Sequence, residues 1–524
     1  MKLDFSLQFE LLAQRFGDHE ALVNIERARR FDFRELHLLT NRIVNAMRDE
    51  LGLRRGEVYF CILDNDNLSL LHHWTLFKGD ATAAWTNYRD SLDEHLWQID
   101  FVTPSVVFLE RDLLATHLEP LRERGVRVVC MDPIDEPIDG VQEFWPLVDG
   151  ASDANPGVEN EAFEDPLLFR FTGGTTGKGK CASYTIDNWL ACRDAFYAHP
   201  EALWRTGMRF LHLAPLSHGS GLMVLPCFFR GGCTITQNVP DLGRWCANVE
   251  AERVTAAMAV PTLLYRLLEL PEAKEHDLSS LETLIYGAAP MSPDKLRRLQ
   301  ERFGNVFVQI YGATECCIPV TCLGKSDHAE ALERPQLLAS AGRVTPGVEV
   351  RVVDSEDRPV ATGEIGELLL RSRGTISGYF QNAEQTATEF DKGFWRSGDL
   401  GFLDEHGFVT IVDRKKDMIV SGGFNVYATE VEAALDSHPA VLMSAVVGVP
   451  HEEWGEAIHA EVILKNGQEA APEHLIEHVK EHLARFKAPK TVAIVEDLPL
   501  SSAGKVLRRA VREKYWSGHD RRVS

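Results

Sequence analysis

Residues 172 to 180 combine a flexible backbone with groups that bind phosphate. The stretch contains four glycines together with hydroxyl and ammonium donors: Thr172, Gly173, Gly174, Thr175, Thr176, Gly177, Lys178, Gly179 and Lys180. Glycines let backbone N–H groups approach a ligand closely, and the threonines and lysines add donors and positive charge. The pattern favours a polyphosphate-binding loop, although a flexible surface turn also fits these residues.

An ordinary P-loop is the first alternative for this stretch. Residues 174 to 180 match the spacing G-x-x-x-x-G-K. The next residue is Cys181, where a P-loop needs Ser or Thr to hold magnesium, and residues 182 to 185 resemble a short strand instead of the start of a helix. The order of residues therefore argues against a P-loop kinase or ATPase.

Polar side chains also follow several runs that are predicted to be strands. His218 lies in a Gly/Ser turn after residues 210 to 214, although a solvated loop histidine would fit as well. Glu315 closes the run Tyr311-Gly312-Ala313-Thr314-Glu315, in which the tyrosine can stack on a base and the carboxylate can hold Mg²⁺. Asp399 follows a Gly turn, where it can accept hydrogen bonds from ribose hydroxyls or form an Asx-turn. Lys505 ends a small-residue loop near the C-terminus.

The elements that must position these groups alternate between strands and helices over the first 340 residues. Apolar runs at 58–63, 106–109 and 126–130 predict buried strands, and residues 33 to 51 predict an amphipathic helix. This alternation implies parallel sheets with right-handed crossovers. Residues 132 to 165 are rich in Asp, Glu, Pro and Gly, which predicts a loop or linker.

After about residue 345 the pattern changes to short antiparallel strands with Gly turns. The charge run at 413–417 then separates these strands from a last α/β segment, and we place a domain boundary there. The expected fold is α/β. Its large N-terminal domain contains parallel α/β subdomains and a small β-barrel-like subdomain, and a small mobile α+β C-terminal domain follows. The expected domains are residues 1–415 and 416–524.

The composition of the chain limits the classes of function that it can have. The chain has 524 residues, too many for one core, and a formal net charge of −23, which argues against non-specific nucleic-acid binding. No apolar run is long enough to span a membrane, and the first residues lack a signal-peptide core. The ten cysteines show no C-x-x-C spacing, so we expect reduced thiols, no zinc site and a cytoplasmic protein.

Six short motifs together resemble the adenylate-forming superfamily, which includes acyl-CoA synthetases, aryl-CoA ligases, luciferases and peptide-synthetase adenylation domains. In chain order they are the glycine loop, 287–290, 311–315, 397–399, 413–417 and 502–505. The glycine loop is similar to T-S-G-T-T-G-x-P-K-G but departs from it at Gly173, Gly179 and Cys181. The first hundred residues are the least typical, with Trp85 and Tyr88 where the family usually has Pro and Leu.

The resemblance implies a role for each matching position. The glycine-loop threonines and Lys180 would bind the β- and γ-phosphates, Thr314 an α-phosphate oxygen, and Glu315 would hold Mg²⁺. Gly287, Ala288 and Ala289 would line the adenine and acyl region, Tyr311 with Gly312 would face adenine, Asp399 would bind ribose, and Arg414 ribose or phosphate. His218 would stand between the acyl pocket and the thiol tunnel, Lys416 would be the hinge, and Lys505 the adenylation lysine. Gly422 and Gly423 would line the CoA tunnel.

The implied activity is ATP-dependent ligation of a carboxylic acid to CoA, through an acyl-adenylate and with release of pyrophosphate and AMP. Residues 217–222, 287–290 and 316–319 are small or apolar, which favours an uncharged, hydrophobic acid. A carrier protein is the alternative acceptor, and a luciferase-like oxygenase or a silent nucleotide-binding scaffold are further alternatives. The expected partners are the acid, ATP and CoA, with no nucleic acid, and the expected state is a monomer or homodimer.

Overall fold

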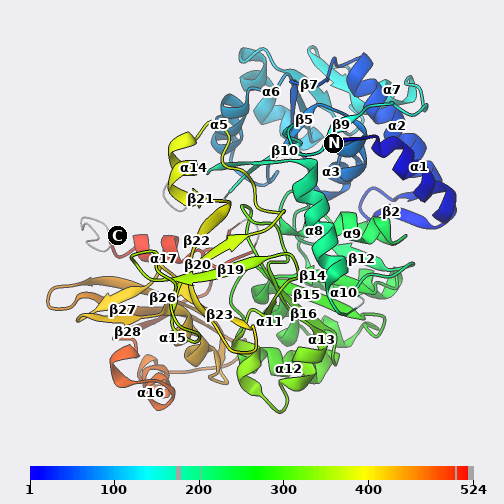
Figure 1. The fold of residues 1–524 in the computed structure, drawn as a ribbon. Helices are drawn as coiled ribbons and strands as arrows, with labels where there is room; N and C mark the ends of the chain where they lie inside the picture. The colour runs from blue at the N-terminus through cyan, green and yellow to red at the C-terminus, as the bar shows by residue number, and fades with distance from the viewer. Residues whose placement is uncertain (173–178, 202, 502–503, 517–524) are drawn as a thin grey trace.

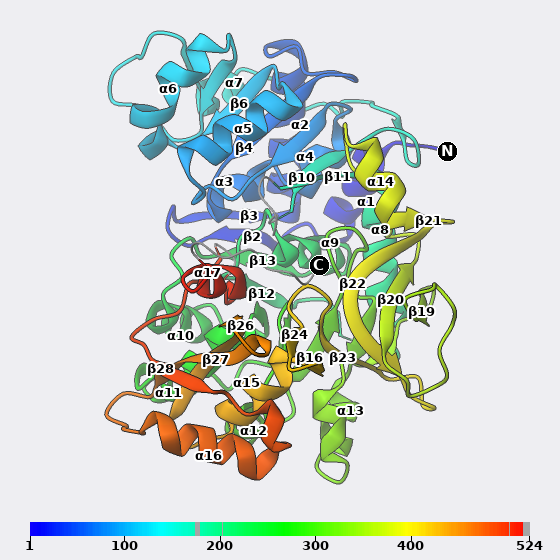
Figure 2. The same cartoon turned by 90° about the vertical axis from the view of Figure 1, so that its left-hand side faces the viewer.

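The computed structural model describes residues 1–172, 179–201, 203–501 and 504–516. Four large sheets organise this part of the chain, and a fifth, two-stranded sheet joins β1 (Lys2–Leu3) to β9 (Asn160–Glu161). In Figures 1 and 2 the first large sheet is mainly blue to cyan, the second is green apart from its blue strands β2 (Glu20–Asn24) and β3 (Arg29–Asp32), the third is yellow-green to yellow, and the last is orange to red. The chain is mixed α/β with largely parallel sheets in its first two thirds, as the alternating pattern predicted.

The first sheet has seven strands in the order β11-β10-β5-β4-β6-β7-β8. Its strands pair in parallel except for β10 with β11, which flank the glycine loop as an antiparallel pair. The strands are β4 (Val58–Ile62), β5 (Thr82–Trp85), β6 (Val106–Leu109), β7 (Arg127–Cys130), β8 (Val141–Glu143), β10 (Leu168–Phe171) and β11 (Cys181–Tyr184). The accompanying helices are α2 (Phe33–Asp49), α3 (Asn65–Leu70), α4 (His73–Lys78), α5 (Leu92–Val102), α6 (Leu114–Glu123) and α7 (Phe144–Asp149).

The second sheet has nine strands in the order β18-β17-β16-β15-β14-β12-β13-β2-β3, with a parallel centre from β16 to β2. Its strands are β2 (Glu20–Asn24), β3 (Arg29–Asp32), β12 (Arg209–His212), β13 (Cys233–Thr236), β14 (Ala256–Ala259), β15 (Thr283–Gly287), β16 (Phe307–Tyr311), β17 (Thr321–Leu323) and β18 (Arg343–Val344). Helices α1 (Phe5–Phe16), α8 (Ile186–Ala198), α9 (Val224–Phe229), α10 (Leu242–Ala251), α11 (Pro261–Glu269), α12 (Pro293–Phe303) and α13 (Lys325–Glu330) belong to this half. One hydrophobic core joins the first two sheets.

The third sheet is antiparallel, as expected for the segment after residue 345. It contains β19 (Glu349–Val353), β20 (Gly366–Arg371), β21 (Phe390–Asp391), β22 (Phe394–Leu403) and β23 (Val409–Arg414), with α14 (Ala383–Glu389) beside it. The last sheet contains β24 (Ile419–Ser421), β25 (Phe424–Val426), β26 (Val441–His451), β27 (Gly455–Leu464) and β28 (Thr491–Ile494). Its helices are α15 (Ala428–Asp436), α16 (Pro472–His482) and α17 (Arg508–Glu513).

The predicted domain boundary falls between β23 and β24, which belong to different sheets. Asp413, at the end of β23, is buried and accepts a hydrogen bond from the backbone N–H of Ala428, at the start of α15. Its other oxygen lies 3.4 Å from Arg508, which also pairs with Glu432. These contacts hold the segments on the two sides of the boundary together in this structure. Rotation of the C-terminal segment about the boundary remains a prediction.

The prediction of a loop or linker over residues 132 to 165 was wrong in part. The segment contains β8, the short helix α7, and β9 (Asn160–Glu161), which pairs with β1 (Lys2–Leu3). Phe144 and Val148 of α7 are buried. These elements are too short to show a periodic pattern, and tertiary packing stabilises them instead of local propensity. Among the described residues, no helix combines the length and apolarity that crossing a bilayer requires.

Candidate active site

The predicted ribose-binding carboxylate is held by residues from two sheets. Tyr311 ends β16, and its hydroxyl donates to Asp399 Oδ2 at 2.6 Å. Arg414, opposite Asp399 in the β22–β23 ladder, places Nε 3.3 Å from the other carboxylate oxygen. Burial and the negative charge of Asp399 raise the pKa of Tyr311 well above its usual value, so the phenol stays a neutral donor. The arrangement gives an oriented carboxylate that can accept from ligand hydroxyls.

The predicted magnesium ligand belongs to a hydrogen-bonded network. Glu315 is only 7% exposed and lies 2.8 Å from the Tyr379 hydroxyl. Tyr379 also contacts Glu389, which forms an ion pair with Lys180. Burial raises the pKa of Glu315, since the charged form is poorly solvated there. A single buried carboxylate beside a phosphate loop fits Mg²⁺, which usually takes one or two carboxylates and completes its shell with water and phosphate oxygens.

The C-terminal lysine reaches this region on the loop between β28 and α17. The loop that carries Lys505 is docked by a 2.6 Å hydrogen bond from the Thr262 hydroxyl to the carbonyl of Gly504. Burial and the charge of Arg414 lower the pKa of Lys505 to about 8, and Asp399 opposes that shift. Lys505 thus shares an electrostatic environment with the groups predicted to bind ribose and phosphate.

His218 lies in the same environment. Its Nδ1 is 3.1 Å from the Ser217 hydroxyl. Burial, followed by the charges of Arg170 and Lys505, lowers the pKa of His218 to about 3, so the imidazole is neutral at pH 7. The histidine is half-buried, which excludes the alternative of a fully solvated loop residue.

Small residues in the predicted adenine segment are required by close packing. A Cβ added at Gly287 would lie 2.2 Å from the carbonyl oxygen of Ile310, because β15 and β16 pair there. Ala288 has a φ of 68°, an unusual conformation for a residue with a side chain. At Gly312 an added Cβ would lie 2.6 Å from Ile318. Thr314, between these segments, accepts a hydrogen bond from the Tyr184 hydroxyl at its backbone carbonyl.

Two predicted groups remain untested by this geometry. Gly422 and Gly423, with φ of 57° and 83°, form the tight turn between β24 and β25, and Gly422 donates its N–H to the carbonyl of Trp454 at 3.1 Å. Lys416 lies between β23 and β24, where burial and the cations Arg414 and Lys180 lower its pKa to about 8. These positions are compatible with a channel and a hinge beside the site.

The glycine loop is only partly described. Gly173, Gly174, Thr175, Thr176, Gly177 and Lys178 lie outside the described residues. The two ends of the loop meet, since Thr172 N–H donates to the Lys180 carbonyl at 2.8 Å. A Cβ at Gly179 would lie 2.2 Å from the Thr172 carbonyl oxygen, so this glycine permits the approach.

Comparison with known families decides the classification. The model described as "AMP-binding enzyme" matches residues 9–380, and "AMP-binding enzyme C-terminal domain" matches residues 430–505. The chain belongs to the AMP-binding enzyme family. This confirms the resemblance to adenylate-forming enzymes and the expected fold class.

Individual relatives agree with the family assignment. The medium/long-chain-fatty-acid–CoA ligase FadD8 of Mycobacterium tuberculosis is 35% identical over 431 residues, covering 80% of this chain and 74% of the relative. The fatty acid–[acyl-carrier-protein] ligase ScoC of Streptomyces coeruleorubidus is 32% identical over 505 residues, covering 95% and 94%. The structure of ATP-bound MatB from Rhodopseudomonas palustris superposes with a TM-score of 0.85 at 27% identity, covering 97% of this chain and 99% of that one.

Sequence reasoning missed three residues that contact the predicted site segments of this AMP-binding enzyme. Tyr379 and Glu389 lie in an unremarkable stretch with no local signal, because their role comes from contacts with Glu315 and Lys180. Arg170 carried a detectable signal, a charged residue inside the apolar run at 167–171. All ten cysteines are free and buried in this structure, and their reduced state in the cell stays a prediction.

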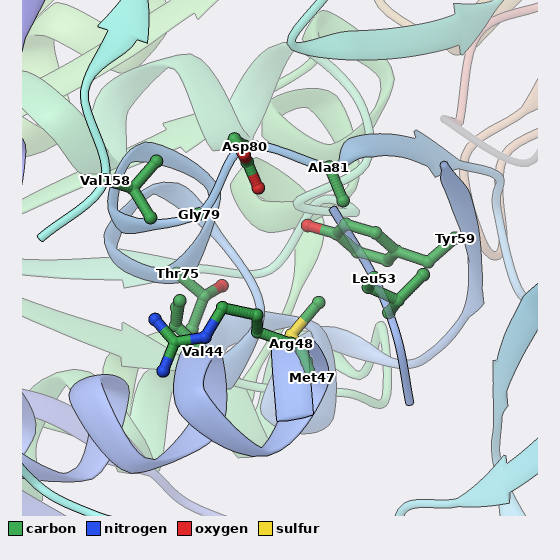
Figure 3. Close-up of a pocket in the computed structure, with 10 residues that line it drawn as sticks. All are labelled: Val44, Met47, Arg48, Leu53, Tyr59, Thr75, Gly79, Asp80, Ala81 and Val158. Carbon is green, nitrogen blue, oxygen red and sulfur yellow. The ribbon is translucent and has the colours of Figure 1, made fainter. Parts of the chain in front are cut away.

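The cavity in Figure 3 lies elsewhere, between α2, α4 and the start of β4 and β5. Its lining includes the Tyr59 hydroxyl and Asp80, and its volume of about 20 Å³ suits one water molecule. A cavity of this size cannot hold an acyl group, so it carries no part of the site.

Proposed function

We propose that this protein is an ATP-dependent carboxylic acid–CoA ligase that acts on an acid with a hydrophobic body. The observation that carries the proposal is the cluster of Asp399, Tyr311 and Arg414, which two sheets bring together and whose charges act on Lys505 of the C-terminal loop. The similarity to a fatty-acid–CoA ligase over most of the chain supports it.

In the first half-reaction the acid's carboxylate attacks the α-phosphorus of ATP, and pyrophosphate leaves. Asp399 accepts hydrogen bonds from the ribose hydroxyls, Thr314 donates to an α-phosphate oxygen, and Lys505 offsets the charge that develops between carboxylate and phosphate. Glu315 would hold Mg²⁺, which when bound offsets charge on the phosphates. The glycine-loop threonines and Lys180 hold the β- and γ-phosphates. Lys180 leaves its ion pair with Glu389 when it binds phosphate.

In the second half-reaction the thiol of CoA attacks the acyl carbon, and AMP leaves. Lys505 must withdraw to admit the thiol, which requires the C-terminal domain to turn about Lys416 and bring Gly422 and Gly423 toward the site. The neutral His218 can then orient the thiol beside the acyl group.

A panel of carboxylic acids tests this function. Each acid is assayed for pyrophosphate release with ATP, with and without CoA, and the nucleotide product is identified. The ligase produces AMP, pyrophosphate and an acyl-CoA, whereas formation of ADP would refute adenylation. Because ScoC is similar over nearly the whole chain, a phosphopantetheinylated carrier protein is included as a second acceptor. If the acyl group is transferred to the carrier protein in preference to CoA, the carrier protein and not CoA is the acceptor.

The docked position of the C-terminal domain rests on a buried ion pair. Lys295 of α12 and Asp436 of α15 lie 3.2 Å apart, with side chains 3% and 9% exposed. Lys295 also donates to the Leu442 carbonyl, and apolar residues of β26 pack in the same core as α11 and α12. Rotation of the domain must break these contacts, so they stabilise only the arrangement in which Lys505 is docked.

We expect Lys295→Met to slow adenylation about 10- to 100-fold, because an unpaired buried carboxylate costs roughly 3 kcal/mol and would now penalise docking. Thioester formation from preformed acyl-adenylate should stay within about twofold of wild type. Stopped assays of each half-reaction measure this. Lys392→Met, at a side chain 84% exposed, is the matched control, and the exchange Lys295→Asp with Asp436→Lys should restore adenylation. Equal slowing of both steps would contradict the expectation.

A further inference from the structure

Arg170 is a buried cation on the inner face of β10. Its neighbours Phe169 and Phe171 point to the opposite face, where they pack against Phe380 and Trp97. Arg170 is 6% exposed, and its Nε donates to the carbonyl of Ser217 at 3.1 Å. Its guanidinium carbon also lies 5.7 Å from the centre of the Tyr184 ring. The side chain therefore crosses from the first sheet to the His218 loop.

No carboxylate neutralises this guanidinium within the described part of the chain. Two other largely enclosed arginines differ: Arg209 pairs with Glu20 and Glu252, and Arg508 with Glu432, Asp413 and Asp417. A buried charge without a counter-charge is costly, so such groups are normally paired. The carbonyl of Ser217 and the ring and hydroxyl of Tyr184 still leave several of the five N–H donors of Arg170 for another acceptor.

The surroundings of Arg170 are the segments expected around the acyl group. Ser217, its hydrogen-bond acceptor, contacts His218. The positive charge of Arg170 also acts on Cys317 and Cys192, and the Cys192 thiol donates to the carbonyl of Ile318 at 2.8 Å. His218 is influenced by both Arg170 and Lys505. Arg170 thus lies beside segments predicted to surround the acyl group, and its charge acts on the same histidine as the lysine predicted to meet the reacting carboxylate.

We propose that Arg170 is a specificity-determining residue that binds a second oxygen acceptor, a keto or carboxylate group, on the acid. The inference rests on the proposed ligase function and narrows its substrate class. It modifies the expectation of an uncharged, hydrophobic acid: the body of the acid is hydrophobic, and one oxygen acceptor remote from the reacting carboxyl binds the guanidinium of Arg170. A charge-assisted hydrogen bond of this kind favours the matching acid about 10- to 100-fold.

Two matched sets of acids test the inference on the full-length protein. The linear set is octanoic, 7-oxooctanoic and octanedioic acid. The aryl set is 3-phenylpropanoic, 3-(4-acetylphenyl)propanoic and 3-(4-carboxyphenyl)propanoic acid. In at least one set the wild type should show a kcat/KM for a keto or dicarboxylic member roughly 10- to 100-fold above that of the plain acid. Equal values within both sets would overturn the inference while leaving ligase activity demonstrated.

Arg170→Met should remove that preference while changing kcat/KM for the plain acid less than about threefold and leaving the KM for ATP unchanged. Arg170→Gln keeps a donor for the Ser217 carbonyl, so this variant is used for the same measurement if Arg170→Met does not fold. Arg193→Met, at an arginine paired with Asp194, is the matched control. An equal loss of kcat/KM with every acid would show that Arg170 only supports the His218 loop. A raised KM for ATP would show that it acts on the phosphates. Either result would overturn the proposal. Absence of pyrophosphate release with every acid would instead refute the ligase function.

Discussion

Lys505→Ala should lower carboxylate-dependent pyrophosphate release by a factor on the order of 10²–10³, because it removes the one charge that spans carboxylate and α-phosphate. Thioester formation from preformed acyl-adenylate should remain largely intact, since in the proposed mechanism Lys505 withdraws before that step. Both half-reactions are measured separately, the first by pyrophosphate release and the second from synthetic acyl-adenylate. An equal loss in the two steps would contradict the role of Lys505.

The same lysine predicts a pH dependence. Burial and Arg414 lower the pKa of Lys505 to about 8, with Asp399 opposing and the neutral His218 nearby. The protonated form carries the useful charge, so kcat/KM for adenylation should fall as pH rises through about 8. Lys505→Arg, which stays charged, should lose this alkaline limb, and retention of the limb would assign it to another group.

Glu315→Gln should lower kcat/KM for ATP by about 10²-fold, because an amide cannot supply the negative charge that a divalent cation needs. The substitution keeps shape and an acceptor for the Tyr379 hydroxyl, which lies 2.8 Å away, so folding should be preserved. Titration of Mg²⁺ in the pyrophosphate assay should show a higher requirement in the variant. Glu384→Gln on the exposed face of α14 is the control.

The Glu315 carboxylate also limits adenylation at acid pH. Burial raises the pKa of Glu315, and the ionised form is the one that binds a cation. Adenylation should therefore weaken as pH falls toward that raised pKa, and excess Mg²⁺ should relieve the loss. An unchanged Mg²⁺ requirement in Glu315→Gln would show that the cation is held by other groups.

The fold class could be predicted because buried parallel strands leave continuous apolar runs. The runs at 58–63 and 106–109 became β4 and β6, and the change of pattern after residue 345 became the antiparallel third sheet. The short elements inside residues 132–165 could not be predicted, because α7 has one turn and a half of helix and is stabilised by burial of Phe144 and Val148.

Local chemistry was readable from the chain alone: which loops carry glycine, hydroxyl, carboxylate or ammonium groups, and in what order. A turn's backbone freedom and a side chain's charge depend on residue type, so Thr172, Glu315, Asp399 and Lys505 could be named before any contact was known. Only the three-dimensional arrangement decided which groups meet. Tyr311 and Asp399 are brought together by two sheets and Lys505 by docking of its loop, while no described residue that packs around Arg170 supplies a counter-charge. Such pairings depend on sheet topology and burial. These are properties of the whole chain, so a short stretch of sequence does not predict them.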